Sequence, residues 1–175
     1  MPSRPVIYLI CTGNAARSVM AVTMLRTLTD ACEFRGAGTH SIEGLPMSVR
    51  TRTALDRHGL SDFEHRSHQL NAADVAAADL MITMEPDHVE WVRREHPGGE
   101  AYTATLRRLV RDLEPASIGT GVESLAARVA ALDLAHVVVE EWETVVDPAS
   151  GDQVEFDRCA DELAELVAPL SRILR

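Results

Sequence analysis

A cysteine and an arginine separated by five residues stand directly after a short apolar run near the N-terminus. Cys11 follows the run at 6–10, and Arg17 is followed at once by Ser18. In a loop that leads from a strand into a helix, backbone N–H groups and the positive end of the helix converge on a point that favours an anion. A thiol there ionises more readily than a free thiol, and a guanidinium offers a planar pair of donors to two phosphoryl oxygens. The spacing therefore predicts a thiolate nucleophile that faces a phosphate group.

The residues between these two suit the binding of a tetrahedral oxyanion. Gly13 allows the chain to turn, and Asn14 tolerates a left-handed conformation while its side chain can tie the loop together. The hydroxyl of Ser18 can donate to the sulfur of Cys11. A buried cysteine at a strand end is common, but it explains neither the Gly-Asn pair nor the helix that follows. We expect the phosphate to be bound by Thr12, Gly13, Asn14, Ala15, Ala16, Arg17 and Ser18.

A second candidate for chemistry is Asp147, which precedes Pro148. Cleavage of a phosphate ester requires a proton for the leaving oxygen, and a positioned carboxylic acid supplies it. The same carboxylate can then activate the water that hydrolyses a phosphoenzyme. Asp-Pro is by itself an ordinary turn signal, so the catalytic interpretation depends on the Cys11 loop.

The elements that must position these residues alternate between strands and helices. Apolar runs predict strands at 6–10, 32–38, 80–84 and about 101–103. Helical spacing and caps predict helices at 18–29, 48–58, 71–78, 86–96 and 106–113. A last helix is expected to have one apolar face, made of Phe156, Cys159, Leu163, Leu166, Val167, Leu170 and Ile173. This order predicts a three-layer α/β fold: a four-stranded parallel sheet with helices on both faces and the phosphate-binding loop after the first strand.

Length and composition predict one domain over residues 1–175. The chain is 46% hydrophobic and 25% charged, with a net charge of −10 that argues against nucleic acid or an anionic membrane as a partner. No apolar run approaches the roughly 20 residues of a membrane span. Three cysteines without paired spacing indicate reduced thiols and a cytoplasmic location. His40, His88 and His96 lack a metal-ligand spacing and are expected at solvated positions, so we expect no metal and no cofactor. Nothing indicates the oligomeric state.

Residues from about 114 to 140 predict a helical elaboration of this domain. Val122, Leu125, Val129 and Leu132 recur at helical spacing, between Gly119-Thr120-Gly121 and the valines at 137–139. Most long insertions carry structure, which favours a packed elaboration. A lid or specificity element is the alternative, because the segment ends just before Asp147.

The whole pattern resembles the low-molecular-weight protein tyrosine phosphatase family, which shares its fold with the thioredoxin-coupled arsenate reductases. Beside residues 11–18 and Asp147-Pro148, further landmarks occur in the expected order: Gly36-Ala37-Gly38-Thr39, His58-Gly59-Leu60, His65-Arg66-Ser67-His68-Gln69-Leu70, Asp79-Leu80-Met81-Ile82-Thr83-Met84 and Thr105-Leu106-Arg107-Arg108-Leu109. The resemblance implies a metal-independent phosphomonoester hydrolase that works through a cysteinyl-phosphate intermediate. It implies catalytic roles for Cys11, Arg17 and Asp147. Ser18, Asn14 and His65 would support the loop, although His65 could equally be a solvated or core histidine.

Departures from the family pattern concern the substrate. Family members commonly place aromatic residues after the Asp-Pro pair and in the loop after the second strand; here Ala149-Ser150-Gly151 and Ser41-Ile42 stand there. Two aromatic contacts of about 0.5 to 1.5 kcal/mol each are missing, so phosphotyrosine selection should be about tenfold weaker or more. The substrate slot is expected to be lined by Ile42, Leu45, Met47 and Ala149. Ala16 stands where many relatives have a second cysteine, and Gly36 where a serine commonly supports the loop asparagine.

Three functions therefore stay open. The first is a phosphatase that acts on a phosphorylated protein, with a small phosphorylated metabolite as the competing substrate. The second is an arsenate reductase that uses an external thiol, because Cys32 and Cys159 are better explained as core residues. The third is a phosphate-binding module without turnover, against which the presence of nucleophile, arginine and acid argues.

Overall fold

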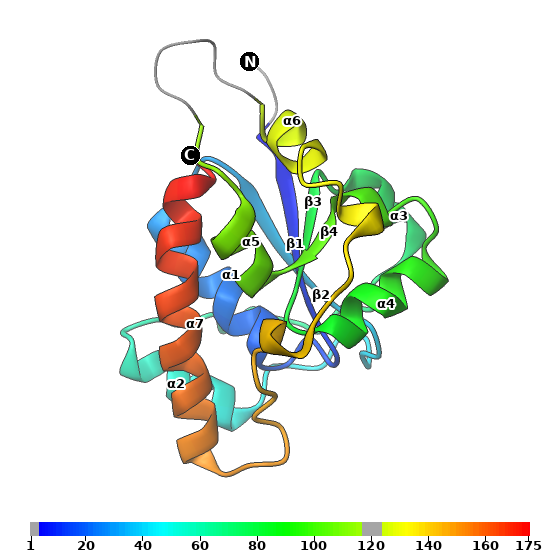
Figure 1. Cartoon of the computed structure of the whole chain (residues 1–175). Coiled ribbons are helices and arrows are strands. Elements are labelled where there is room, and N and C mark those ends of the chain that lie inside the picture. Colours follow the sequence, from blue (N-terminus) through cyan, green and yellow to red (C-terminus); the bar gives the residue numbers. More distant parts are fainter. Residues whose placement is uncertain (1–3, 117–123) are drawn as a thin grey trace.

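A computed structural model describes residues 4–116 and 124–175 of the chain (Figure 1). Its centre is a four-stranded parallel sheet with the strand order β2-β1-β3-β4. The strands are β1 (Val6–Cys11), β2 (Glu33–Gly38), β3 (Leu80–Thr83) and β4 (Thr103–Thr105). In the register of the sheet, Cys11 lies opposite Gly38 and Ile10 lies opposite Thr83. The carboxyl ends of the strands therefore meet at one edge, where the cysteine stands, and the predicted sheet is confirmed.

Helices cover both faces of the sheet, as predicted (Figure 1). One face carries α1 (Arg17–Leu28), α2 (Val49–Arg57), α5 (Leu106–Asp112) and α7 (Gln153–Ile173). The other carries α3 (Ala72–Ala77) and α4 (Pro86–Glu95). Each layer buries its own hydrophobic cluster against the sheet. No helix among the described residues is long and apolar enough to cross a membrane.

Local sequence explains where most helices begin. Ser48 and Asn71 accept hydrogen bonds from the first turns of α2 and α3, and Pro86 opens α4. Five predicted helices, at 18–29, 48–58, 71–78, 86–96 and 106–113, lie within one residue of those observed. The predicted strand at 101–103 instead begins at Thr103, because η1 (Glu100–Tyr102) forms a 3-10 turn before it.

The segment from 114 to 140 forms only short helices where the structure describes it. They are α6 (Leu125–Ala130) and η2 (Leu134–His136), and they bury Leu125, Val129 and Leu134 in the larger core cluster. Val122, which the predicted helix included, lies outside the described residues. After η2, residues 137–147, here called the strap, pass β4 and run toward the carboxyl ends of the strands (Figure 1). The strap contains one further turn, η3 (Glu141–Glu143).

Candidate active site

The loop at 12–16 joins the end of β1 to the start of α1 and holds Cys11 and Arg17 at its two ends. Both side chains are buried; the cysteine is 3% exposed and the arginine 1%. The Cys11 sulfur lies 3.0 Å from the hydroxyl oxygen of Ser18, which is also buried. A hydroxyl at this distance can donate to a thiolate and stabilise its charge.

Asn14 ties the loop to the chain around it. Its backbone has a φ of 50°, the left-handed conformation that asparagine tolerates. Its side chain donates to Ser18 Oγ over 2.8 Å and accepts from the backbone N–H of His68 over 3.0 Å. Its carbonyl accepts from His65 Nε2 at 2.8 Å and from Ser67 Oγ at 2.9 Å. Burial lowers the pKa of His65 although the bond to Asn14 opposes this, so the neutral ring donates to the loop from Nε2.

Arg17 is held by two carboxylates from distant parts of the chain. Its Nη1 lies 2.8 Å from Glu85 Oε2, and its Nη2 lies 2.8 Å from Asp147 Oδ2. Nη1 also donates to the carbonyl of Val145 over 3.0 Å. Burial acts to lower the pKa of Arg17, but the hydrogen bond to Glu85 and the nearby negative charges outweigh it and raise the pKa. The guanidinium is thus charged, and each of its terminal nitrogens is held in a fixed orientation by a carboxylate.

Glu85 and His88 complete the site, and the sequence did not indicate either. Glu85 precedes the first residue of α4, and its Oε1 lies 3.0 Å from Nε2 of His88. The same nitrogen is 3.0 Å from Thr12 Oγ1. Burial opposes ionisation of Glu85, but hydrogen bonds from His88 and Arg17 lower its pKa to about 2. The prediction that His88 is solvated is wrong: it is 3% exposed, because the first turn of α4 packs against the loop. The only sequence signal for the pair is its spacing at i and i+3 directly after β3.

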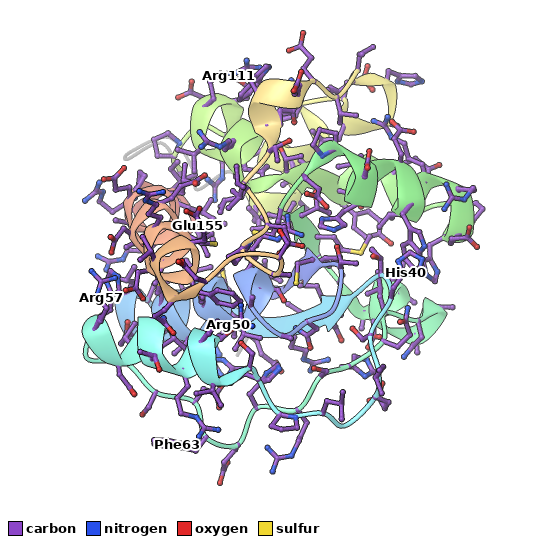
Figure 2. The ribbon with its side chains drawn as sticks, turned by 90° about the horizontal axis from the view of Figure 1, so that it is seen from below. His40, Arg50, Arg57, Phe63, Arg111 and Glu155 are labelled. Carbon is purple, nitrogen blue, oxygen red and sulfur yellow. The ribbon has the colours of Figure 1, made fainter. Side chains whose placement is uncertain are left out.

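The residues predicted to line a substrate slot lie at different depths. Ile42 is 70% exposed, and Leu45 and Ala149 are also exposed. Met47 is 5% exposed and packs in the larger core cluster, so it offers a substrate little surface. Figure 2 looks onto this end of the molecule, with His40 on one side and Arg50 and Glu155 on the other.

Two rings lie beside the loop, whereas the two positions expected to lack rings, 41–42 and 149–151, carry none. Trp91 of α4 and His40 meet edge to face, with ring centroids 5.9 Å apart. They border a cavity of about 360 Å³ that also includes Thr12 and Glu85. Trp91 lies on a helix on the other side of Thr12, outside the two loops that commonly carry aromatic residues in the family that the sequence resembles.

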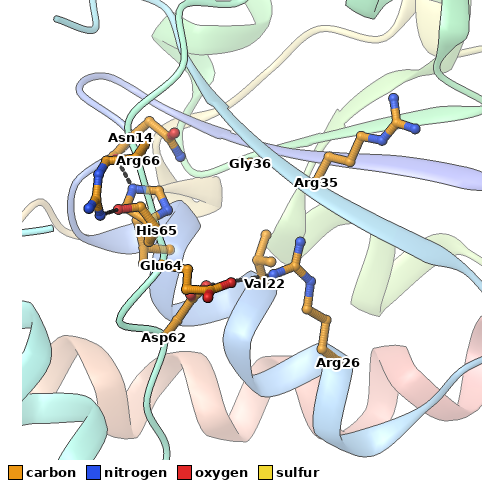
Figure 3. A pocket seen from close by; sticks show the side chains of 10 residues that line it. Asn14, Val22, Arg26, Arg35, Gly36, Asp62, Glu64, His65 and Arg66 are labelled. Carbon is orange, nitrogen blue, oxygen red and sulfur yellow. Dashed lines mark hydrogen bonds and ion pairs between the residues drawn. The ribbon is translucent and has the colours of Figure 1, made fainter. Parts of the chain in front are cut away.

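A second cavity, of about 300 Å³, lies behind the loop, where Asn14 faces Gly36 and His65 (Figure 3). Arg26, Arg35 and Arg66 are also among its lining residues. A Cβ atom on Gly36 would come within 2.8 Å of Asn14 Nδ2. The glycine thus leaves the room that the asparagine side chain occupies.

The other two cysteines do not ionise readily. Cys32 and Cys159 are buried and free. Burial raises the pKa of Cys32 to about 11 and that of Cys159 to about 12. Across residues 4–116 and 124–175, no three His, Cys, Asp or Glu side chains gather in a group that could hold a metal ion.

Comparisons with known proteins agree with this geometry. The sequence pattern of a family described as "Low molecular weight phosphotyrosine protein phosphatase" matches residues 6–123. A probable low molecular weight protein-tyrosine-phosphatase, EpsP of Ralstonia nicotianae, is 29% identical over 137 residues, which are 78% of this chain and 92% of the relative. A protein-arginine-phosphatase of Geobacillus stearothermophilus is 32% identical over 111 residues, which are 63% of this chain and 73% of the relative.

A solved structure shares the fold. The YwlE arginine phosphatase from Geobacillus stearothermophilus superimposes with a TM-score of 0.74 and 25% identity, covering 95% of this chain and 90% of its own. The arrangement of sheet, loop and helices described above is therefore one that a known phosphatase also has.

Proposed function

Because this chain belongs to the low molecular weight phosphotyrosine protein phosphatase family and is a phosphatase of the kind that uses a cysteine nucleophile, we propose that Cys11 is the nucleophile, Arg17 the phosphate-binding cation and Asp147 the general acid. One observation carries the assignment. Arg17 lies at the end of the nucleophile's loop and is bonded to Asp147 over 2.8 Å, although 130 positions separate them in the sequence. Phosphate-binding group, nucleophile loop and acid thus occupy one place.

In the first half of the reaction, the Cys11 thiolate attacks phosphorus in line with the leaving oxygen. The S–P bond forms as the P–O bond breaks, and the electron pair of that bond goes to the leaving oxygen, which takes a proton from Asp147. The guanidinium of Arg17 binds two of the phosphoryl oxygens, and the backbone N–H groups of residues 12–17 surround them. Glu85 holds the guanidinium in the orientation that this binding needs.

In the second half, a water molecule attacks the phosphorus of the cysteinyl phosphate. The ionised Asp147 accepts a proton from the water as the new P–O bond forms. The S–P bond breaks, and the electron pair returns to sulfur. The Ser18 hydroxyl, 3.0 Å away, then stabilises the departing thiolate, so that inorganic phosphate is released and the enzyme is regenerated.

Turnover of para-nitrophenyl phosphate in a chelating buffer tests the assignment. We expect hydrolysis without added metal and loss of turnover by at least about a thousandfold in Cys11→Ser, with inorganic phosphate still bound. Asp147→Ala should slow substrates with poor leaving groups far more than activated aryl phosphates. Full turnover in Cys11→Ser would disprove the nucleophile, and equal losses for all leaving groups would move the acid elsewhere.

The substrate we propose is a phosphorylated residue of a protein. Exposed apolar side chains at the site end, among them Ile42, Leu45 and Val146, suit contact with a polypeptide better than with a small polar metabolite. Phosphotyrosine is the family's named substrate. A phosphotyrosyl peptide should therefore be hydrolysed with a higher kcat/KM than sugar or nucleoside phosphates, and the reverse order would favour the metabolite.

Phosphoarginine is a second candidate, favoured by a specific feature of the site. Glu85 and Asp147 both bond the guanidinium of Arg17, so two carboxylates stand beside the phosphate position and can face the guanidinium of a phosphoarginine. The curated relative that is 32% identical is a protein-arginine-phosphatase. Peptides that carry the two phosphorylated residues in one sequence context separate these possibilities by their kcat/KM values.

Arsenate reduction is not favoured, because the matched family and the relatives described above are phosphatases. The two further thiols are buried, so the chain supplies no exposed resolving cysteine.

A location in the reducing cytoplasm is also proposed, and the three free cysteines support it. Fractionation of cells that express the native chain tests this.

A further inference from the structure

Glu143 is the most completely buried carboxylate of the strap. It bonds the end of β4, the start of α5 and the strap's own backbone. Its side chain has no exposed surface. Oε2 accepts from Thr105 Oγ1 at 2.5 Å and from Arg108 Nε at 3.0 Å. Oε1 accepts from a second nitrogen of Arg108 and from the backbone N–H of Glu140. The carboxylate is thus fully satisfied by a bidentate arginine, a hydroxyl and a backbone donor.

The partners of Glu143 are fixed parts of the sheet edge. Thr105 is the last residue of β4 and caps α5, and Arg108 lies in the first turn of that helix. Burial opposes ionisation of Glu143, but the bonds from Arg108 and Thr105 outweigh it and lower its pKa. A buried ion pair of this kind adds little to stability compared with well-packed apolar side chains. Its effect is geometric, because it allows the strap one position against β4.

Two residues farther along, the strap is bonded to the phosphate-binding arginine and to the residue that follows β3. Val145 donates to the carbonyl of Met84 over 2.7 Å, and its own carbonyl accepts from Arg17 over 3.0 Å. Arg107 donates to the carbonyl between these anchors, that of Thr144, over 3.1 Å. The backbone from 143 to 145 is therefore attached to Met84 directly after β3, to α5 and to the phosphate-binding arginine.

Asp147 itself has few attachments of its own. Its side chain is 40% exposed, and in the part of the chain that the structure describes its partners are Arg17 and the backbone N–H of Ala149. A phosphoryl group that binds both guanidinium nitrogens competes for the first of these. During reaction the place of Asp147 is then set mainly by the backbone that precedes it.

From these contacts we infer that Glu143, clamped by Arg108 and Thr105, is a positioning residue that holds Asp147 within reach of the leaving oxygen. The inference rests on the proposed role of Asp147 as the acid. Glu143 does not touch the substrate; it fixes the strap four residues before the acid.

The consequence is a loss confined to proton transfer. When the acid is misplaced, phosphoryl transfer to Cys11 slows for an alkyl or phenyl leaving group, which needs the proton. It slows little for para-nitrophenolate, which leaves well without one. The parameter to compare is kcat/KM, because it covers the steps up to and including transfer to the cysteine.

The experiment measures kcat/KM for phenyl and para-nitrophenyl phosphate in Glu143→Gln and Arg108→Lys. Glutamine keeps the shape of Glu143 and removes its charge, and lysine removes the bidentate fork. Glu141→Gln is the matched control, because Glu141 is exposed in the same turn. In both variants we expect kcat/KM for phenyl phosphate to fall about tenfold or more. The value for para-nitrophenyl phosphate should fall no more than about threefold. The inhibition constant for inorganic phosphate should not rise, because Arg17 is intact, and all values for the control should stay within about twofold of the unmodified enzyme.

Asp147→Asn separates failure of the inference from failure of the proposed function. If it shows no dependence on the leaving group, the acid is wrongly assigned and the positioning role falls with it. If it shows the dependence and the Glu143 and Arg108 variants do not, or if these lose both substrates equally, the positioning role alone is disproved. Should Glu143→Gln fail to fold, Arg108→Lys and Thr105→Val give the same comparison. The double variant Glu143→Gln/Asp147→Asn should be no slower than Asp147→Asn alone.

Discussion

Arg17 Nη2 lies 2.8 Å from Asp147 Oδ2, so the proposed acid forms an ion pair with the phosphate-binding group. A phosphoryl dianion that binds both guanidinium nitrogens must share or replace this contact. The dianion also lies close to the carboxylate, and the two negative charges repel each other. Phosphate binding and the position of the acid are thereby coupled through one pair of side chains.

Asp147→Asn should therefore bind phosphate more tightly while it turns over more slowly. Removal of the carboxylate charge frees the guanidinium and removes a repulsion, which is worth about 1 kcal/mol at a partly exposed site, or roughly fivefold in affinity. The measurement is the inhibition constant of inorganic phosphate against para-nitrophenyl phosphate at neutral pH.

Asp152→Asn is the matched control for this change. It removes one nearby negative charge, and asparagine keeps the helix cap that Asp152 gives α7. Its phosphate affinity should stay nearly unchanged. Weaker phosphate binding in Asp147→Asn than in the unmodified enzyme would contradict the competition for Arg17.

Glu85 should make the fold sensitive to acid. The folded chain keeps this carboxylate ionised down to a pKa of about 2, whereas the unfolded chain protonates it near the ordinary value of 4.5. As pH falls from 4.5 toward 2, the unfolded state takes up the proton first. The stability that Glu85 contributes is therefore fully present above this window and is lost within it. The contribution at neutral pH is at most about 3 kcal/mol.

Thermal unfolding at several pH values tests this with Glu85→Gln. The variant should be less stable than the unmodified protein at neutral pH, and the difference between the two Tm values should shrink from pH 5 to pH 2.5. Parallel Tm curves would show that Glu85 does not carry this acid dependence.

The nucleophile loop could be predicted because its chemistry lies in consecutive residues. Cys11, Asn14 and Arg17 each have a type and a spacing that local backbone physics explains, and the alternation of apolar runs predicts the sheet around them. The shift of β4 to Thr103 is a local failure of the same kind of reasoning, because a 3-10 turn and a strand start share the same apolar pattern.

The charged partners could not be predicted in this way. Glu85 reaches Arg17 across 68 positions, and Glu143 reaches Thr105 across 38. No periodicity relates such residues, and in sequence each is one of many acidic residues of a chain with net charge −10. Trp91 could not be predicted to line the cavity beside Thr12, because an aromatic residue on a helix ordinarily indicates core packing.

Gly36→Ala should disturb the nucleophile loop more than it disturbs the fold. The added Cβ would come within 2.8 Å of Asn14 Nδ2, and Asn14 is fully buried and bonded on both sides of its amide. We expect a loss of about 1 to 3 kcal/mol in stability from overpacking, with kcat lowered about tenfold because the loop changes shape. Kinetics below the Tm of the variant, together with thermal unfolding, measure the two effects.

Val22→Ala is the control for Gly36→Ala. Val22 borders the same cavity, and its truncation lowers stability without pressing on the asparagine. It should lose stability and keep kcat. If both variants lose activity in proportion to stability, the shape of the loop is not what Gly36 protects.

Oxidation should inactivate this enzyme permanently, because Ala16 supplies no thiol beside Cys11. The other two thiols are buried, with pKa values raised to about 11 and 12, so peroxide acts on the nucleophile. Its sulfenic acid then proceeds to sulfinic acid, which dithiothreitol does not reduce. Prolonged peroxide treatment should leave activity unrecoverable and add about 32 Da to the peptide that contains Cys11, as mass spectrometry measures.

The variant Ala16→Cys should reverse this outcome. A thiol at position 16, where many members of the family have one, can condense with the sulfenic acid: the S–S bond forms, water leaves, and further oxidation is blocked. Dithiothreitol then restores most of the activity of the variant, while the unmodified enzyme stays inactive under the same treatment. Full recovery of the unmodified enzyme would show that another group protects Cys11, and equal loss in both would place residue 16 out of reach of the nucleophile.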